Sequence, residues 1–157
     1  MGQDHVGRSG SLHAGFTLVE LIIVVATVGI IAAVAVPNLL NALDKSRQKA
    51  TMNDLRTIAT AIESYAVDSS AYPVSITSWS ALKPLVDPYF IKDAPGSDGW
   101  SNSWEVATGA TGRDYSMISL GKDGASGARG GGKTTDFDCD IIFRTGQFFQ
   151  WPEGTQT

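Results

Sequence analysis

The longest hydrophobic pattern lies near the start of the chain. From Leu21 to Leu43 the sequence reads LIIVVATVGIIAAVAVPNLLNAL, without a charged residue. About 20 apolar residues in a helix are enough to span a hydrocarbon layer of roughly 30 Å. The run therefore predicts a membrane-spanning helix.

The helical pattern continues beyond this run in an amphipathic form. Hydrophobic residues recur at spacings of three and four, which is typical of a helix with one buried face; they are Met52, Leu55, Ala59, Ile62 and Ala66. We predict one helix over residues 16–67, about 75 Å long at 1.5 Å per residue. Pro37 is expected to kink or loosen it, because proline removes one backbone hydrogen bond and clashes with the preceding turn.

The pattern changes after YPVS, residues 72–75. Residues 78–86 (SWSALKPLV) predict a short capped helix interrupted by Pro84. Short β-type runs follow at residues 104–106, 115–119, 141–143 and 147–151, and the last two, separated by RTG, predict a hairpin. We expect an α+β fold: a long N-terminal α-helix whose second half packs on a small antiparallel β-sheet head with a Gly/Asp-rich loop.

Composition narrows the functional classes. The chain has 157 residues, 43% of them hydrophobic, which fits one folded domain of ordinary size. Its 12 Lys and Arg against 16 Asp and Glu give a net charge of −4, which disfavours nucleic-acid binding. The single cysteine, Cys139, cannot form an internal disulfide, and we expect it to be a buried, inert thiol.

One motif suggests a nucleotide site. GARGGGKT, residues 127–134, matches the phosphate-loop pattern G-x-x-x-x-G-K-[ST]. A phosphate loop needs a buried strand before it and a helix after it, whereas the flanks here are LGKDGAS and TDFDCDII. The acids that follow would also repel a triphosphate. We therefore expect no nucleotide binding.

The apolar run has two simple interpretations, a permanent anchor and a secretory signal peptide cut after the A-x-A of residues 33–35. Residues 1–15 contain only Arg8 as a basic residue, offset by Asp4, so they lack the basic region of a signal peptide. Neither interpretation requires Glu20 at the edge of the run, where ionised groups are rare and usually functional.

Residues 15–40, GFTLVELIIVVATVGIIAAVAVPNLL, resemble the N-terminal segment of prepilins, the precursors of type IV pilins and of the pseudopilins of type II secretion. The resemblance implies that a prepilin peptidase cuts between Gly15 and Phe16 and methylates the new N-terminus. It also implies that Glu20 is the family's acid at the fifth mature position and that Pro37 is its helix-interrupting proline. We accordingly expect a leader at 1–15, a transmembrane and polymerisation helix at 16–43, and an amphipathic helix with its head at 44–157.

Glu20 then has a physical role. A carboxylate near hydrocarbon is costly unless it is paired, and cleavage creates a cation at the same depth, the protonated amine of Phe16. The amine of an adjacent subunit, shifted along a fibre axis, could pair with Glu20 as well as its own amine does. Phe16, Glu20 and Pro37 are therefore the predicted assembly residues.

Residues 114–141 resemble the C-terminal part of the major pseudopilins of type II secretion, in which an SLGxDG turn and a later Asp-rich segment bind Ca2+. The resemblance implies calcium ligands at the Leu120 carbonyl, Asp123, and among Asp136, Asp138 and Asp140. Alternation should place these three side chains on one side of an extended segment, where oxygen ligands favour calcium over magnesium. The alternatives are solvated acids for these three, and a turn-forming role for Asp98.

An inventory of side chains argues against catalysis. Both histidines, His5 and His13, lie in the predicted leader, so the mature chain has no imidazole to act as a base, and Cys139 lacks a His partner. We expect a structural protein and no enzyme.

The expected protein is a filament subunit. It would start as an inner-membrane precursor in membrane lipid, with its head in the periplasm, and then form a homopolymer. Its partners would be a prepilin peptidase, an inner-membrane assembly platform and minor pseudopilins. The SLGKDG region and the lack of paired C-terminal cysteines favour a type II secretion pseudopilin. The alternatives are a surface type IV pilin and a membrane-anchored calcium-binding module that never polymerises.

Overall fold

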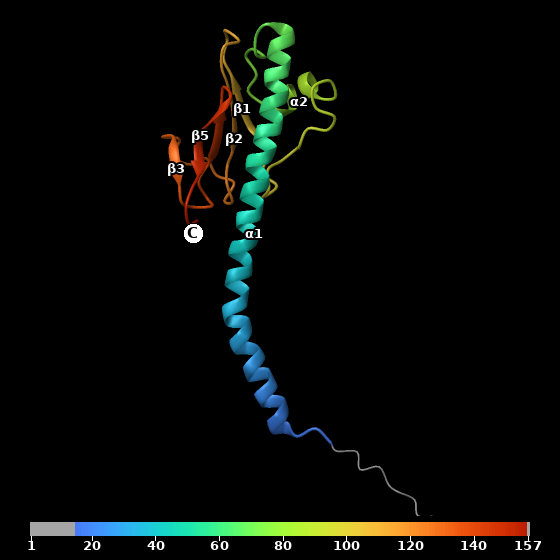
Figure 1. Cartoon of the computed structure of the whole chain (residues 1–157), viewed down its shortest axis with the longest axis vertical. Helices are drawn as coiled ribbons and strands as arrows, with labels where there is room; N and C mark the ends of the chain where they lie inside the picture. Colours follow the sequence, from blue (N-terminus) through green and yellow to red (C-terminus); the bar gives the residue numbers. More distant parts are fainter. Residues whose placement is uncertain (1–14, 157) are drawn as a thin grey trace, which may run out of the picture. The chain divides into compact units, whose positions relative to one another are not determined.

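A computed structural model describes residues 15–156, so most of the predicted leader lies outside the described part of the chain. The chain divides into two compact units, one ending at Asn38 and one beginning at Leu39. Helix α1, Leu18–Ser69, crosses this division and continues through Pro37 (Figure 1). The single helix predicted over residues 16–67 is therefore confirmed to within two residues at each end.

The buried face of α1 begins at Asp44. From there it follows alternating steps of four and three residues; the stripe consists of Asp44, Gln48, Thr51, Leu55, Ile58 and Ile62. Its first half is polar and its second half is apolar, whereas the sequence pattern predicted only the apolar part. Met52 and Ala66 lie at the margin of the stripe, where they are half-buried, because the centre passes through Thr51 and Ile58.

A five-stranded sheet forms the second part of the head (Figure 1). The strands are β1 Glu105–Thr108, β2 Tyr115–Ser119, β3 Gly132–Thr134, β4 Ile141–Arg144 and β5 Gln147–Pro152, in the order β1-β2-β4-β5-β3. The first three pairings across the sheet are antiparallel, and β3 pairs parallel with β5. The α+β fold is thus confirmed, but the sheet has a parallel edge strand that the sequence did not predict.

The predicted hairpin joins β4 and β5. Arg144 pairs with Gln147, so the loop consists of Thr145 and Gly146, with φ of 42° and 83°. Two successive residues with positive φ form the type I′ turn, whose twist matches that of the flanking strands. This local geometry brings the aromatic residues of β5 onto the sheet.

The short helix α2, Trp79–Val86, departs from its prediction in two ways. Pro84 lies within the helix and does not interrupt it, because Trp79, Leu82 and Val86 are buried and their packing outweighs the loss of one hydrogen bond. Ser78 is at the N-cap position, yet its side chain makes no capping bond. Its hydroxyl lies 3.2 Å from that of Ser80 instead.

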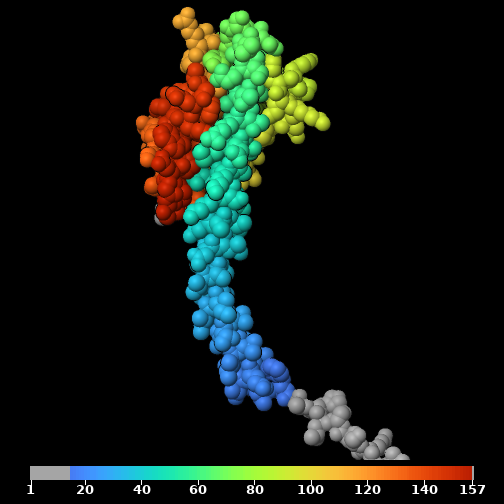
Figure 2. Space-filling model, in the orientation of Figure 1, coloured from blue at the N-terminus to red at the C-terminus, as the bar shows by residue number. Residues whose placement is uncertain are grey.

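One hydrophobic core unites α1, α2 and the sheet. Leu55 and Ile62 of α1 pack with Leu82 of α2 and with Met117 and Phe143 of the sheet. Figure 2 shows the C-terminal half of α1 lying directly against β5, where the Arg56 guanidinium sits 5.1 Å from the centre of the Phe148 ring. The C-terminal half of α1 therefore supplies one side of the hydrophobic core of the head.

Candidate functional site

The N-terminal segment holds the predicted processing and assembly residues. Gly15 and Phe16 precede α1, and the Phe16 side chain is 75% exposed. Every residue from Gly15 to Leu43 is exposed in the single chain. Within the described residues, α1 is the one helix long and apolar enough to cross a membrane.

Glu20 caps the start of α1. Its Oε2 accepts hydrogen bonds from the backbone N–H of Thr17 at 2.9 Å and from the Thr17 hydroxyl at 2.8 Å, while the Glu20 N–H donates to Thr17 Oγ1 at 3.2 Å. This reciprocal arrangement is a capping box, which satisfies backbone donors that the first helical turn leaves without partners. The T-x-x-E spacing of residues 17–20 is the sequence signal for such a box, although Glu20 was predicted only as an assembly residue. Glu20 is therefore fixed in place one turn from Phe16.

A second candidate site surrounds the SLGKDG turn, residues 119–124, which begins at the end of β2. Gly121 has φ of 71°, and a Cβ built on it would lie 2.8 Å from the carbonyl oxygens of Phe137, Asp138 and Cys139. The Lys122 N–H donates to the Phe137 carbonyl at 2.9 Å. The backbones of the SLGKDG turn and of the Asp-rich segment thus meet, as the predicted site requires, and only glycine fits at the contact.

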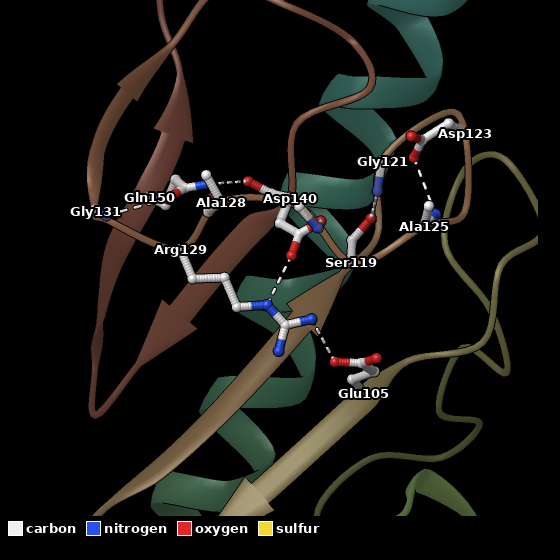
Figure 3. A network of polar contacts seen from close by, with 11 residues as sticks. Glu105, Ser119, Gly121, Asp123, Ala125, Ala128, Arg129, Gly131, Asp140 and Gln150 are labelled. Atoms are coloured by element: carbon white, nitrogen blue, oxygen red, sulfur yellow. Dashed lines mark hydrogen bonds and ion pairs between the residues drawn. The ribbon is translucent and has the colours of Figure 1, made fainter.

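Asp98 connects this turn to the loop over residues 97–103. It is 6% exposed, and its Oδ1 accepts from the N–H groups of Trp100 and Asn102 at 3.0 and 2.8 Å. Its Oδ2 accepts from the Ser119 hydroxyl at 2.6 Å. Ser119 Oγ in turn accepts from the Gly121 N–H at 3.3 Å, as Figure 3 shows. The turn-forming role predicted for Asp98 is confirmed, and the same carboxylate also links two segments of the head.

Lys122 ties the turn to the long helix. Its Nζ lies 2.9 Å from Oδ2 of Asp44, whose Oδ1 accepts from the Trp100 indole N–H at 3.2 Å. The hydrogen bond from Lys122 lowers the pKa of the buried Asp44 carboxyl, with a smaller contribution from Trp100, against the opposing effect of burial. No sequence signal marked Asp44, because a charged residue on a helix is usually exposed.

The Asp-rich segment is not extended as predicted. Residues 136–139 form a turn, in which Asp136 Oδ1 accepts from the Asp138 N–H at 3.0 Å. The side chains of Asp136 and Asp138 are consequently exposed, whereas Asp140 is 0% exposed. The expectation that all three acids share one side was wrong, because a local side chain-to-backbone bond replaces strand geometry.

The predicted ligands do not converge through their carboxylates. Asp123 is exposed, with its Oδ1 accepting from the Ala125 N–H at 3.0 Å, and Leu120 is half-buried beside it. Across residues 15–156, no group of three or more His, Cys, Asp or Glu side chains is placed to hold a metal ion. Both oxygens of Asp140 already have donors, Gly127 N–H at 3.2 Å and Arg129 Nε at 2.7 Å. This arrangement does not fit a calcium ion that uses Asp140, whereas calcium binding through Leu120 and Asp123, with Asp136 or Asp138, stays a prediction.

The Gly-rich loop lacks the geometry of a phosphate loop. Strand β3 starts at Gly132, at the place where a phosphate loop would begin its helix. Lys133 Nζ instead lies 2.7 Å from Oε1 of Glu153.

Cys139 is only half-buried, not buried as expected, and burial together with the nearby Asp136 raises the pKa of its thiol.

Comparison with known proteins gives a consistent family. Residues 38–137 match the family described as "Type II secretion system (T2SS), protein G". Among curated relatives, the type II secretion system core protein G of Pseudomonas aeruginosa is 32% identical over 82% of this chain and 93% of its own length. The corresponding protein of Vibrio cholerae is 32% identical over 76% of this chain and 88% of its own. That of Pectobacterium carotovorum is 29% identical, over 80% and 86%.

The family match covers the amphipathic half of α1, helix α2, strands β1 to β3 and the SLGKDG turn, so it rests on the head. The chain belongs to the protein G family of type II secretion systems.

Proposed function

We propose that this chain is the structural subunit of a type II secretion pseudopilus, in which the N-terminal helices of many copies form the core of the fibre. The observation that carries this proposal is the apolar surface of residues 18–43, which is entirely exposed in the single chain. An exposed apolar surface of this length needs a cover. Membrane lipid covers it before assembly, and helices of neighbouring subunits cover it afterwards.

Glu20 sets the register of the polymer in this proposal. After cleavage between Gly15 and Phe16, the amine of Phe16 is protonated at neutral pH and lies one turn from a carboxylate in an apolar segment. Opposite charges attract strongly where water is excluded. The amine of one subunit therefore pairs with Glu20 of its neighbour.

The capping box supports this role. Thr17 holds Glu20 Oε2 at the start of the helix, so the carboxylate is already positioned before a neighbour arrives. A carboxylate oxygen accepts more than one hydrogen bond, so a neighbouring amine can bind without breaking the cap. The head, with its core of α1 and sheet, then serves as the periplasmic outer layer of the fibre and needs no catalytic group.

The proposed partners follow from this life cycle. A prepilin peptidase removes residues 1–15 and methylates Phe16, and an inner-membrane assembly platform and minor pseudopilins start and end the fibre. The negatively charged chain binds neither nucleic acid nor nucleotide in this role.

The first test is the N-terminus of the assembled protein. Intact-mass analysis should find residues 1–15 absent and one methyl group added. An intact Met1 would favour an anchored module that does not polymerise, and a chain that starts at Val36 would establish the signal-peptide interpretation. Fibres displayed on the cell surface would instead favour a type IV pilin.

The second test separates the charge of Glu20 from its cap. Gln also forms capping boxes, so Glu20→Gln keeps the helix start and removes the charge, whereas Glu20→Ala removes both. We expect both variants to insert into the membrane and neither to form fibres in electron micrographs. Normal assembly of Glu20→Gln with failure of Glu20→Ala would show that the cap, and not the charge, is the assembly contact.

A further inference from the structure

Asp140 is a carboxylate in the interior of the head. It precedes β4 and is 0% exposed. An ionised carboxylate in such a place requires a positive partner and donors for both oxygens. The partner is Arg129, whose Nε lies 2.7 Å from Oδ2, and the Gly127 N–H donates to Oδ1 at 3.2 Å (Figure 3). Both donors come from the Gly-rich loop, residues 127–132.

Arg129 also reaches a second strand. One of its terminal nitrogens lies 2.6 Å from Oε2 of Glu105, the first residue of β1, while its Nε stays on Asp140 (Figure 3). The planar guanidinium directs its donors in a fixed fork, so one side chain holds two carboxylates that belong to different parts of the sheet. A bound divalent cation would make the same kind of connection between carboxylates.

A buried amide fastens the loop on both sides of Arg129. Gln150 of β5, 3% exposed, donates from Nε2 to the carbonyls of Ala128 and Asp140 at 3.0 and 2.8 Å. Its Oε1 accepts from the Gly131 N–H at 3.1 Å. The backbone immediately before and shortly after Arg129 is thus fixed to the sheet, which places the guanidinium at Asp140 without help from an ion.

From these contacts we infer that Arg129 is a built-in cation that takes the place of a divalent metal ion at Asp140. The guanidinium neutralises the buried carboxylate, and Gln150 holds the loop that carries it. The head therefore keeps its Gly-rich loop ordered in the absence of calcium. The Arg129–Asp140 pair lies within the head, so its role does not depend on polymerisation.

The test measures the melting of the full-length chain in detergent micelles. All four tryptophans lie between residues 79 and 151, so tryptophan fluorescence reports on the head and not on the membrane helix. Wild type is melted in EDTA for reference, and Asp123→Ala, which lacks the carboxylate predicted to bind calcium in the turn after β2, is melted in EDTA and in millimolar calcium chloride. We expect the two melting temperatures of Asp123→Ala to agree within about 2 °C, because a ligand that does not bind the folded state does not stabilise it. An increase of about 5 °C or more with calcium would overturn the inference.

Variants of Arg129 provide the second measurement. Arg129→Met keeps an unbranched apolar stem but leaves Asp140 buried without a cation, so the melting temperature in EDTA should fall by roughly 10 °C. Arg113→Met, at an exposed arginine in the β1–β2 connection, is the matched control and should melt like wild type. Arg129→Met melting within about 2 °C of this control would refute the role of the guanidinium.

A double-mutant cycle identifies the partner. Asp140→Asn should destabilise wild type, whereas in the Arg129→Met background it should cause little further loss, because it removes the uncompensated charge. Equal effects of Asp140→Asn in both backgrounds would mean that Arg129 and Asp140 are not coupled, which contradicts the inference.

Discussion

Replacing Asp98 with alanine tests whether one buried carboxylate holds together the loop over residues 97–103. Asp98 accepts from Trp100 N–H at 3.0 Å, from Asn102 N–H at 2.8 Å and from the Ser119 hydroxyl at 2.6 Å. Alanine leaves these three donors without their acceptor. It also frees Ser119 Oγ to rotate away from Gly121, which it now supports.

The size of the effect follows from these bonds. A hydrogen bond to a charged group contributes about 1.5–3 kcal/mol, and a buried donor left unpaired costs about 1–3 kcal/mol. Trp100 and Asn102 are half-buried, so water can replace part of what they lose, and neighbouring losses do not add fully. We therefore expect Asp98→Ala to lower the free energy of unfolding by about 3–5 kcal/mol. For a head of this size the melting temperature should fall by roughly 12–20 °C.

The assay is thermal melting of the full chain in detergent, followed by tryptophan fluorescence. Asp98→Asn keeps one acceptor for the two N–H groups and should lose less than half as much as alanine. Asp93→Ala is the matched control, because the Asp93 side chain is 92% exposed, and surface substitutions change stability by about 0.5 kcal/mol or less. If Asp98→Ala melts within about 3 °C of Asp93→Ala, the carboxylate does not organise this region.

Three further predictions concern the core, the turn after β2 and the hydrogen bond from Tyr72 to Glu63. Ile62→Ala, at a fully buried position of α1, should destabilise the head by about 2–5 kcal/mol in denaturant melts. Gly121→Ala should cost at least about 2 kcal/mol because of its positive φ and the carbonyls around it, whereas Gly130→Ala, with nothing within 4 Å of its Cβ, should be neutral. Burial and the hydrogen bond to Glu63 raise the pKa of Tyr72 to about 12, so the stability that this phenol contributes is present below pH 10 and lost as pH rises towards 12. Tyr72→Phe should make alkaline unfolding between these pH values less steep, and an unchanged pH profile would show that another group is responsible.

Short-range sequence patterns predicted the main elements of the fold. The spacing of Leu55, Ala59 and Ile62 located the buried face of α1, and the RTG segment located the β4–β5 turn, because both depend on interactions between residues close in sequence. The burial of the polar residues Asp44 and Gln48 on the same helix face could not be predicted from spacing. Its burial depends on partners such as Lys122 and Gln156, which lie far away in the chain.

The predicted site around the Asp-rich segment, residues 136–140, also depends on contacts between residues far apart in the sequence. The sequence located its acidic residues and turns, but it provided no way to tell Asp140, in the interior, from the exposed Asp138 two residues earlier. The difference arises from a turn and from Arg129, which a regular alternation does not reveal. Strand β3 was missed for a related reason, since Gly-Lys-Thr has no intrinsic strand preference and takes its conformation from β5.

The position of β3 has a consequence for crowding in a fibre. Heads packed side by side at high local concentration could join sheet to sheet if one of them offered a long, flat edge with unpaired backbone groups. Here β3 covers the edge of β5 and is only three residues long, with glycine and lysine among them. At the opposite edge, the Thr108 N–H donates to the Ile76 carbonyl at 3.0 Å and its hydroxyl accepts from the Ile76 N–H at 2.8 Å. The β5 edge and the Thr108 end of β1 are thus covered against unintended strand exchange, in keeping with the proposed association of copies through the N-terminal helix.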